Sequence, residues 1–133
     1  NWRDVDAEAG SISDHVELHP SYRTKPVSQL SGGNQQKVLF GKCFGQSADI
    51  IIFDEPTVGV DMGTRAALYL LIKELAEAGK AIVVISSDLP EVMNLAHRMI
   101  VLAHGHITAE LAGEDMNEEQ VLKYFFDESG AKQ

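Results

Sequence analysis

Two stretches of this 133-residue sequence carry residues whose types and spacing suit phosphate chemistry. The first contains Ser31, Gly32 and Gly33 at the expected start of a helix, where glycines leave backbone N–H groups uncovered and anions are attracted. In the second, Asp54 and Glu55 directly follow a short apolar run. One carboxylate at such a position can bind Mg²⁺ while its neighbour polarises a water molecule. Together the two stretches predict chemistry on a nucleotide phosphate.

The hydrophobic pattern predicts the elements that must position these residues. Residues 50–53 and 81–85 are short apolar runs, typical of strands buried on both faces of a parallel sheet. Ser31 is the expected cap of a helix over residues 34–45, and an apolar stripe of 3.6-residue period predicts another helix over residues 63–78. This order predicts an α/β fold with a right-handed crossover, in which ligands collect at the carboxyl ends of the strands.

The last third of the chain predicts a β-hairpin followed by a helix. Residues 98–103 and 107–111 have the pattern of strands, and the tight turn at residues 104–105 places a glycine where positive φ is needed. Asn117 is the expected cap of a short helix over residues 118–126, whose apolar side chains can pack on the domain.

Three motifs in this order resemble the ATP-binding-cassette (ABC) ATPases, and among them the second cassette of the fused sugar-importer ATPases. They are Ser-Gly-Gly-Asn-Gln-Gln-Lys at residues 31–37, Asp-Glu-Pro-Thr at 54–57 and Ser-Ser-Asp-Leu-Pro-Glu at 86–91. The resemblance extends from about Pro26 to about Phe125. It implies a parallel sheet flanked by helices like that of P-loop NTPases, with ATP and Mg²⁺ as cofactors.

The resemblance also implies how the signature segment acts. Ser31, Gly32 and Gly33 would supply a hydroxyl and amides in trans, to the γ-phosphate of ATP held by a partner cassette. Asn34 stands in the same nucleotide-binding segment, where most cassettes have Gln, a departure shared with the sugar-importer group. Asp61 would lie on the loop that faces the partner cassette, and it is also a suitable cap for the helix that follows it.

The carboxylates and the third motif receive roles in the same way. Asp54 is assigned to Mg²⁺ and Glu55 to polarising the attacking water. Most cassettes have a His after the next strand, where this chain has Ser86 and Ser87. Ser87, the candidate residue at that catalytic position, has a shorter side chain that cannot carry a positive charge. A role for Ser87 or Asp88 as the cap of a helix over residues 89–96 is sufficient to explain these residues. Because the usual His is missing, the resemblance implies slow or absent turnover at the ATP site that Asp54 and Glu55 complete.

The expected layout is part of a cassette. Residues 1–29 are interpreted as a partial helical-subdomain segment and loop cut from something longer, with 14–18 as a short helix or strand. Residues 30–126 are interpreted as the C-terminal half of an ABC ATPase domain, and 127–133 as a polar tail. No Gly-x-x-x-x-Gly-Lys-Ser/Thr motif occurs in these 133 residues. We therefore expect the isolated chain not to bind ATP tightly.

Composition limits the partners. A net charge of −9 argues against a nucleic-acid surface, which needs clustered Lys and Arg, and the single Cys43 fits a reducing compartment. No apolar run approaches the ~20 residues that span a bilayer. The resemblance implies a second cassette, transmembrane permease subunits and, indirectly, an external solute-binding protein, with the chain at the cytoplasmic side of a bacterial inner membrane.

Two rival functions remain open, and one residue pair has an alternative role. A chromosome-maintenance or DNA-repair ATPase shares the signature and the carboxylates, but it would need a coiled-coil insertion and a basic surface. In a non-catalytic α/β module, Asp54 and Glu55 would only bind a cation or cap a helix. His15 and His19 are spaced for metal binding on a helix, but a solvated surface pair is favoured because no third ligand lies nearby.

Overall fold

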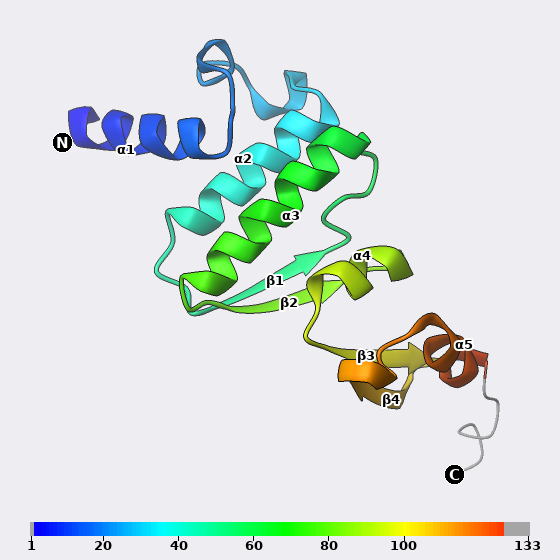
Figure 1. Ribbon diagram of the computed structural model, residues 1–133. Coiled ribbons are helices and arrows are strands. Elements are labelled where there is room, and N and C mark those ends of the chain that lie inside the picture. Colours follow the sequence, from blue (N-terminus) through cyan, green and yellow to red (C-terminus); the bar gives the residue numbers. More distant parts are fainter. Residues whose placement is uncertain (1, 127–133) are drawn as a thin grey trace. The chain divides into compact units, whose positions relative to one another are not determined.

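The computed structural model describes residues 2–126, and the chain divides into two compact units, Asn1–Ile85 and Ser86–Gln133 (Figure 1). The expected polar tail at residues 127–133 lies outside the described part. The elements of the first unit are α1 (Trp2–His15), α2 (Gly32–Phe44), β1 (Ile50–Asp54), α3 (Met62–Glu77) and β2 (Ala81–Ile85), with 3-10 turns at Pro20–Tyr22 and Val27–Gln29.

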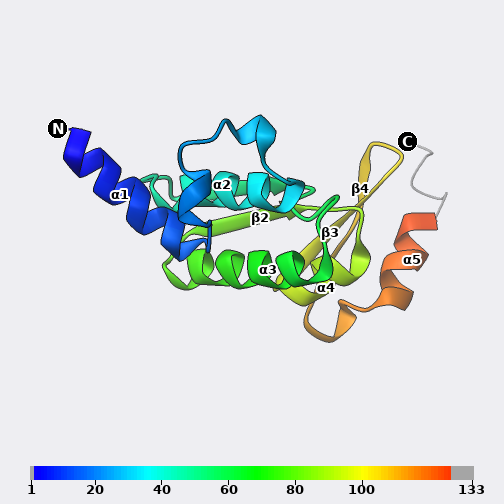
Figure 2. The same ribbon diagram turned by 90° about the horizontal axis from the view of Figure 1, so that it is seen from above.

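In the first unit, the strand–helix–strand prediction is confirmed. β1 and β2 pair in parallel, from Ile50 opposite Ala81 to Asp54 opposite Ile85. Helices α2 and α3 lie side by side across this ribbon (Figures 1 and 2). Since parallel strands share their direction, the pairing brings the carboxyl end of β2 beside the carboxyl end of β1.

The expectation that the strands are buried on both faces is wrong for the chain as it stands. Ile51 and Phe53 are buried, whereas Ile50 and Ile52 are 66% and 62% exposed. Alternate residues of a strand point to opposite faces, and in this unit α2 and α3 cover one of them. Ile85 and its neighbours on the other face of β2 are left half-exposed, so the β1–β2 ribbon has an uncovered apolar face.

The core of the first unit lies under the covered face. Phe40 of α2 is fully buried and stacks on Phe53 of β1, with ring centroids 4.5 Å apart and an interplanar angle of 10°. The predicted stripe of α3 faces the same core through Leu68, Leu71, Ile72 and Leu75. Gly79 ends α3 with φ of +89°, as expected of a glycine at that position.

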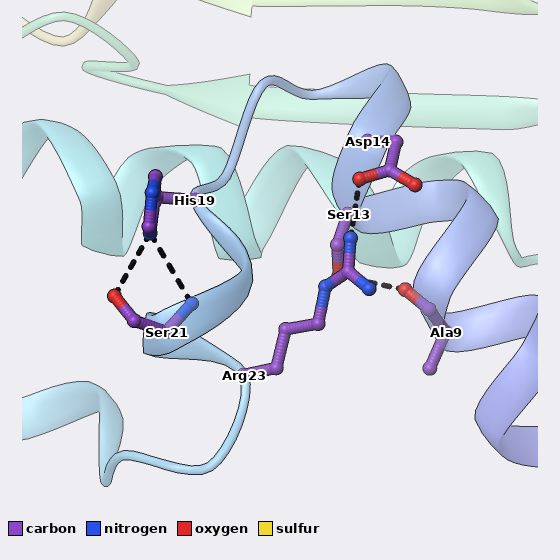
Figure 3. A network of polar contacts seen from close by, with 6 residues as sticks. All are labelled: Ala9, Ser13, Asp14, His19, Ser21 and Arg23. Atoms are coloured by element: carbon purple, nitrogen blue, oxygen red, sulfur yellow. Dashed lines mark hydrogen bonds and ion pairs between the residues drawn. The ribbon is translucent and has the colours of Figure 1, made fainter.

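The expected short helix or strand over residues 14–18 is wrong, because helix α1 covers Trp2–His15 and residues 16–18 lie beyond its end. Helix α1 packs on α2 at Gly41, where an added Cβ would lie 3.1 Å from Ile12 Cγ2. The turn after α1 is held to it by an ion pair between Arg23 and Asp14 (Figure 3). Within α1, Ser13 Oγ donates to Ala9 O at 2.6 Å.

The second unit contains α4 (Leu89–Leu95), the hairpin β3 (Arg98–Ala103) and β4 (His106–Ala112), a 3-10 turn at Gly113–Asp115, and α5 (Glu118–Phe126). The predicted hairpin and final helix are confirmed. Asn117 Oδ1 accepts from the N–H of Gln120 at 3.0 Å, which is the expected cap of α5. The unit's core is formed by four buried side chains, those of Met99, Val101, Leu111 and Val121.

Candidate functional site

The N-terminus of α2 is built by Ser31. Ser31 Oγ accepts from the N–H of Asn34 at 3.4 Å and from Asn34 Nδ2 at 3.0 Å. The turn before it is fixed by Gln35, whose Nε2 donates to Leu30 O at 2.9 Å. The first amides of a helix have no partner within the helix, so those of Gly32 and Gly33 are available to an anion.

The two signature glycines lie against the segment that leads into α3. A Cβ added at Gly33 would lie 3.1 Å from both Cγ2 and Oγ1 of Thr64, and one at Gly32 would lie 3.7 Å from Gly59 O. The first distance is tighter than most real Cβ contacts, so a side chain at Gly33 would displace Thr64. The glycines therefore expose amides and also let the N-termini of α2 and α3 approach each other.

Asp61 caps α3, as expected, through a pair of bonds with one residue. Its Oδ1 accepts from the N–H of Thr64 at 3.0 Å, and its Oδ2 accepts from Thr64 Oγ1 at 2.7 Å. The hydroxyl bond is the main cause that lowers the pKa of Asp61, and the backbone bond adds to it. The Asp61 carboxylate next to the signature turn therefore stays charged to a lower pH than an ordinary Asp.

Thr64 is a residue that the sequence reasoning missed. It lies against Gly33, and it hydrogen-bonds the Asp61 carboxylate through its hydroxyl and its backbone N–H. The spacing of Asp61 and Thr64 is that of a helix cap and its third residue, which could have indicated the bond between them. The contact with Gly33 joins two separate elements, and no pattern within either element indicates it.

Asp54 and Glu55 lie at the carboxyl end of β1. Asp54 is exposed, on the uncovered side of the strand. Glu55 has φ of +47°, a left-handed conformation that is uncommon for a residue other than glycine. Its N–H donates to Ile85 O at 2.8 Å, so the end of β2 holds Glu55 in this conformation. Backbone strain of this kind is concentrated at functional sites.

A hollow of about 100 Å³ lies beside Asp54, between α2 and β1. Its lining is mainly apolar and includes Leu39, Cys43 and Ile52. Burial raises the pKa of the Cys43 thiol, which makes this thiol a weak nucleophile. Small-molecule sites usually measure about 300–1,000 Å³, so this hollow is too small to enclose a nucleotide.

Ser87 belongs to the second unit, two residues after the end of β2. The segment around it forms the start of α4. Asp88 Oδ1 accepts from the N–H of Glu91 at 3.2 Å, and Ser86 Oγ accepts from the N–H of Asp88 at 3.0 Å. The expected helix cap is therefore Asp88, and α4 ends at Leu95, one residue earlier than predicted.

The two histidines before α2 contact different residues. His15 Nε2 lies 2.9 Å from Glu74 Oε2 on α3. His19 Nδ1 accepts from the N–H of Ser21 at 3.2 Å and lies 2.9 Å from Ser21 Oγ (Figure 3). Within residues 2–126, no group of three or more His, Cys, Asp or Glu side chains is arranged to hold a metal ion. The two histidines thus hold separate local contacts.

Comparison with known proteins places these features in a family. Residues 3–58 match the family described as ABC transporter. A putative ribose/galactose/methyl galactoside import ATP-binding protein of Albidiferax ferrireducens is 50% identical over 99 residues, covering 74% of this chain and 20% of that protein. A ribose import ATP-binding protein of Mesorhizobium japonicum is 48% identical over 105 residues, covering 79% and 21%. The chain spans about a fifth of the length of these curated relatives.

Solved structures agree on the fold. The bacterial ABC transporter cassette MJ0796, solved as a dimer, matches with a TM-score of 0.75 and 27% identity, over 84% of this chain and 48% of that one. The cassette MJ1267 in its ADP conformation matches with a TM-score of 0.73 and 27% identity, over 92% and 50%. Across residues 2–126, no helix is long and apolar enough to cross a membrane. The chain belongs to the ABC transporter family, and its α/β fold is that of part of an ATP-binding cassette.

Proposed function

We propose that this chain is part of the ATP-hydrolysing subunit of an ABC importer for a sugar or a sugar-like solute. The observation that carries the proposal is the identity of about half of the aligned residues with proteins described as ribose and galactose import ATP-binding proteins. The signature turn supports it, because Ser31 and the amides after it form an anion-binding helix N-terminus beside Asp61.

The signature turn binds the γ-phosphate of ATP gripped by a partner cassette. Ser31 contributes a hydroxyl, and Gly32 and Gly33 contribute amides that need no movement to reach an anion at the helix end. Donors that are already in place stabilise the charge of the transferring phosphoryl group without reorganisation. Asp61, on the neighbouring loop, faces that partner cassette.

The carboxylates serve the pocket on this chain's own side. An exposed carboxylate at the end of a strand suits Mg²⁺, which is usually bound by one or two carboxylates together with phosphate oxygens, and Asp54 fits this requirement. Mg²⁺, when bound, neutralises phosphate charge. Glu55 orients and polarises the attacking water from a fixed backbone conformation. Because Ser87 stands where a His is usual, this pocket turns over slowly.

The partners follow from the importer role. Two cassettes enclose the nucleotide, their closure is coupled to transmembrane permease subunits, and an external solute-binding protein delivers the solute. The subunit lies peripherally at the cytoplasmic side of the inner membrane. The acidic balance of −9 provides no basis for a nucleic-acid partner.

The isolated chain is expected to bind Mg-ATP only weakly. No phosphate-cradling loop occurs in its sequence, and the hollow beside Asp54 is small. Isothermal titration of the isolated chain should therefore give no saturation at micromolar ATP, whereas the full-length subunit should bind and hydrolyse ATP with Mg²⁺. Micromolar affinity of the isolated chain would show that its own residues grip the nucleotide.

A further inference from the structure

The side chain of Asn34 reaches the hydroxyl that the proposed function places on the γ-phosphate. Its Nδ2 lies 3.0 Å from Ser31 Oγ, and its backbone N–H lies 3.4 Å from the same oxygen. We propose that Asn34 is a positioning residue that turns the Ser31 hydroxyl hydrogen toward the phosphate, instead of a direct ligand of the nucleotide. This inference rests on the proposed function. It gives a role to Asn34, which stands where most cassettes have Gln.

The proposal follows from counting donors and acceptors at one oxygen. A serine hydroxyl has two acceptor sites and one hydrogen to donate. Both N–H groups of Asn34 point at Ser31 Oγ, so the backbone amide takes one acceptor site and the side-chain amide takes the other. Because an NH₂ group accepts nothing, the hydroxyl hydrogen points away from Asn34 Nδ2. Ser31 is exposed, so that hydrogen is free to meet an anion arriving from outside.

Asparagine and glutamine differ at this position for a geometric reason. Asn34 is the third residue after the cap Ser31, where a longer Gln or Glu side chain commonly reaches back to the backbone N–H of the cap residue. The shorter Asn34 side chain ends at the hydroxyl. A glutamine there would fix the backbone of the turn, whereas Asn34 fixes the direction of the hydroxyl.

A double-mutant cycle in the full-length subunit tests this inference. Four proteins are compared by steady-state release of phosphate from Mg-ATP: the unchanged subunit, Ser31→Ala, Asn34→Ala and the double variant. Asn34→Ala should lower kcat about five- to tenfold, the effect of one orienting hydrogen bond. In the Ser31→Ala background the same change should alter kcat less than about twofold, because the hydroxyl that Asn34 orients is gone.

The outcomes separate this inference from the proposed function. An equal loss from Asn34→Ala in both backgrounds, or no loss in either, would overturn the positioning role. If Ser31→Arg leaves turnover intact, the proposed function itself fails. Thermal unfolding of each variant controls for damage to the helix, since the backbone cap from Asn34 to Ser31 survives Asn34→Ala.

Asn34→Asp adds a second measurement: its carboxylate accepts the hydroxyl hydrogen, so in the Ser31 background it should lower kcat more than Asn34→Ala does.

Discussion

Ser31→Arg is expected to abolish ATP turnover by the full-length subunit, with a loss on the order of a hundredfold or more. The substitution removes the hydroxyl and fills the space in front of the exposed amides of Gly32 and Gly33. In the proposed function the signature closes over a nucleotide held by the other cassette, so a bulky side chain there should also keep the two cassettes apart. Phosphate release under saturating Mg-ATP measures the loss.

Glu55→Gln is expected to cost much less in the same assay. In the proposed function Glu55 serves the pocket on its own side. Because Ser87 occupies the sequence position of the usual His, we expect little of the measured turnover to pass through that pocket. Gln has the same size as Glu and is no more strained at the positive φ of this position, so the substitution removes only the charge. Equal losses from Ser31→Arg and Glu55→Gln would reject this asymmetry between the two pockets.

A matched control separates the signature from the surrounding surface. Ser28 lies three residues upstream in the exposed 3-10 turn Val27–Gln29. Ser28→Arg adds the same side chain and charge without touching the helix cap, and it should leave turnover within about twofold, as surface substitutions usually do. In Ser31→Arg, loss of the helix cap that Ser31 provides should destabilise the protein by only about 1 kcal/mol. Inactivity of Ser28→Arg would mean that charge alone, and not the signature, explains the first result.

Phe40→Ala should destabilise the chain by about 3–5 kcal/mol, the usual cost of removing a buried aromatic ring. Phe40 is fully buried and stacked on Phe53, so its loss leaves a cavity at the contact between α2 and β1. Urea unfolding of the 133-residue chain, followed by circular dichroism, measures the change. Leu39, its 50% exposed neighbour on the same helix, provides the control, and Leu39→Ala should cost less than about 1 kcal/mol. Similar costs for the two variants would contradict the packing of α2 on the sheet.

The sequence predicted those parts of the fold that depend on local chemistry. The caps formed by Ser31, Asp61 and Asn117 were recognisable because a short polar side chain precedes each helix. Asp88 was recognisable for the same reason, although α4 ends one residue early. The ABC resemblance is confirmed by the comparisons, and the roles of the site residues remain proposals.

The parts that could not be predicted depend on groups distant in sequence. The runs at residues 50–53 and 81–85 indicated strands buried on both faces, yet only one face of β1 is covered by the helices of this unit. No side chain of helix α1 is fully buried, and Ile12 is only partly covered where it packs on α2, so the apolar pattern of α1 is weak. Glu55, with its positive φ, donates its N–H to the carbonyl of Ile85, which lies thirty residues further along the chain.

The most direct test of the central claim is a structure of the full-length subunit with a non-hydrolysable ATP analogue and Mg²⁺. The account predicts that Ser31 Oγ and the amides of Gly32 and Gly33 lie within hydrogen-bonding distance of the γ-phosphate of a nucleotide gripped by the other cassette. A signature turn remote from every phosphate, with both cassettes loaded, would contradict it.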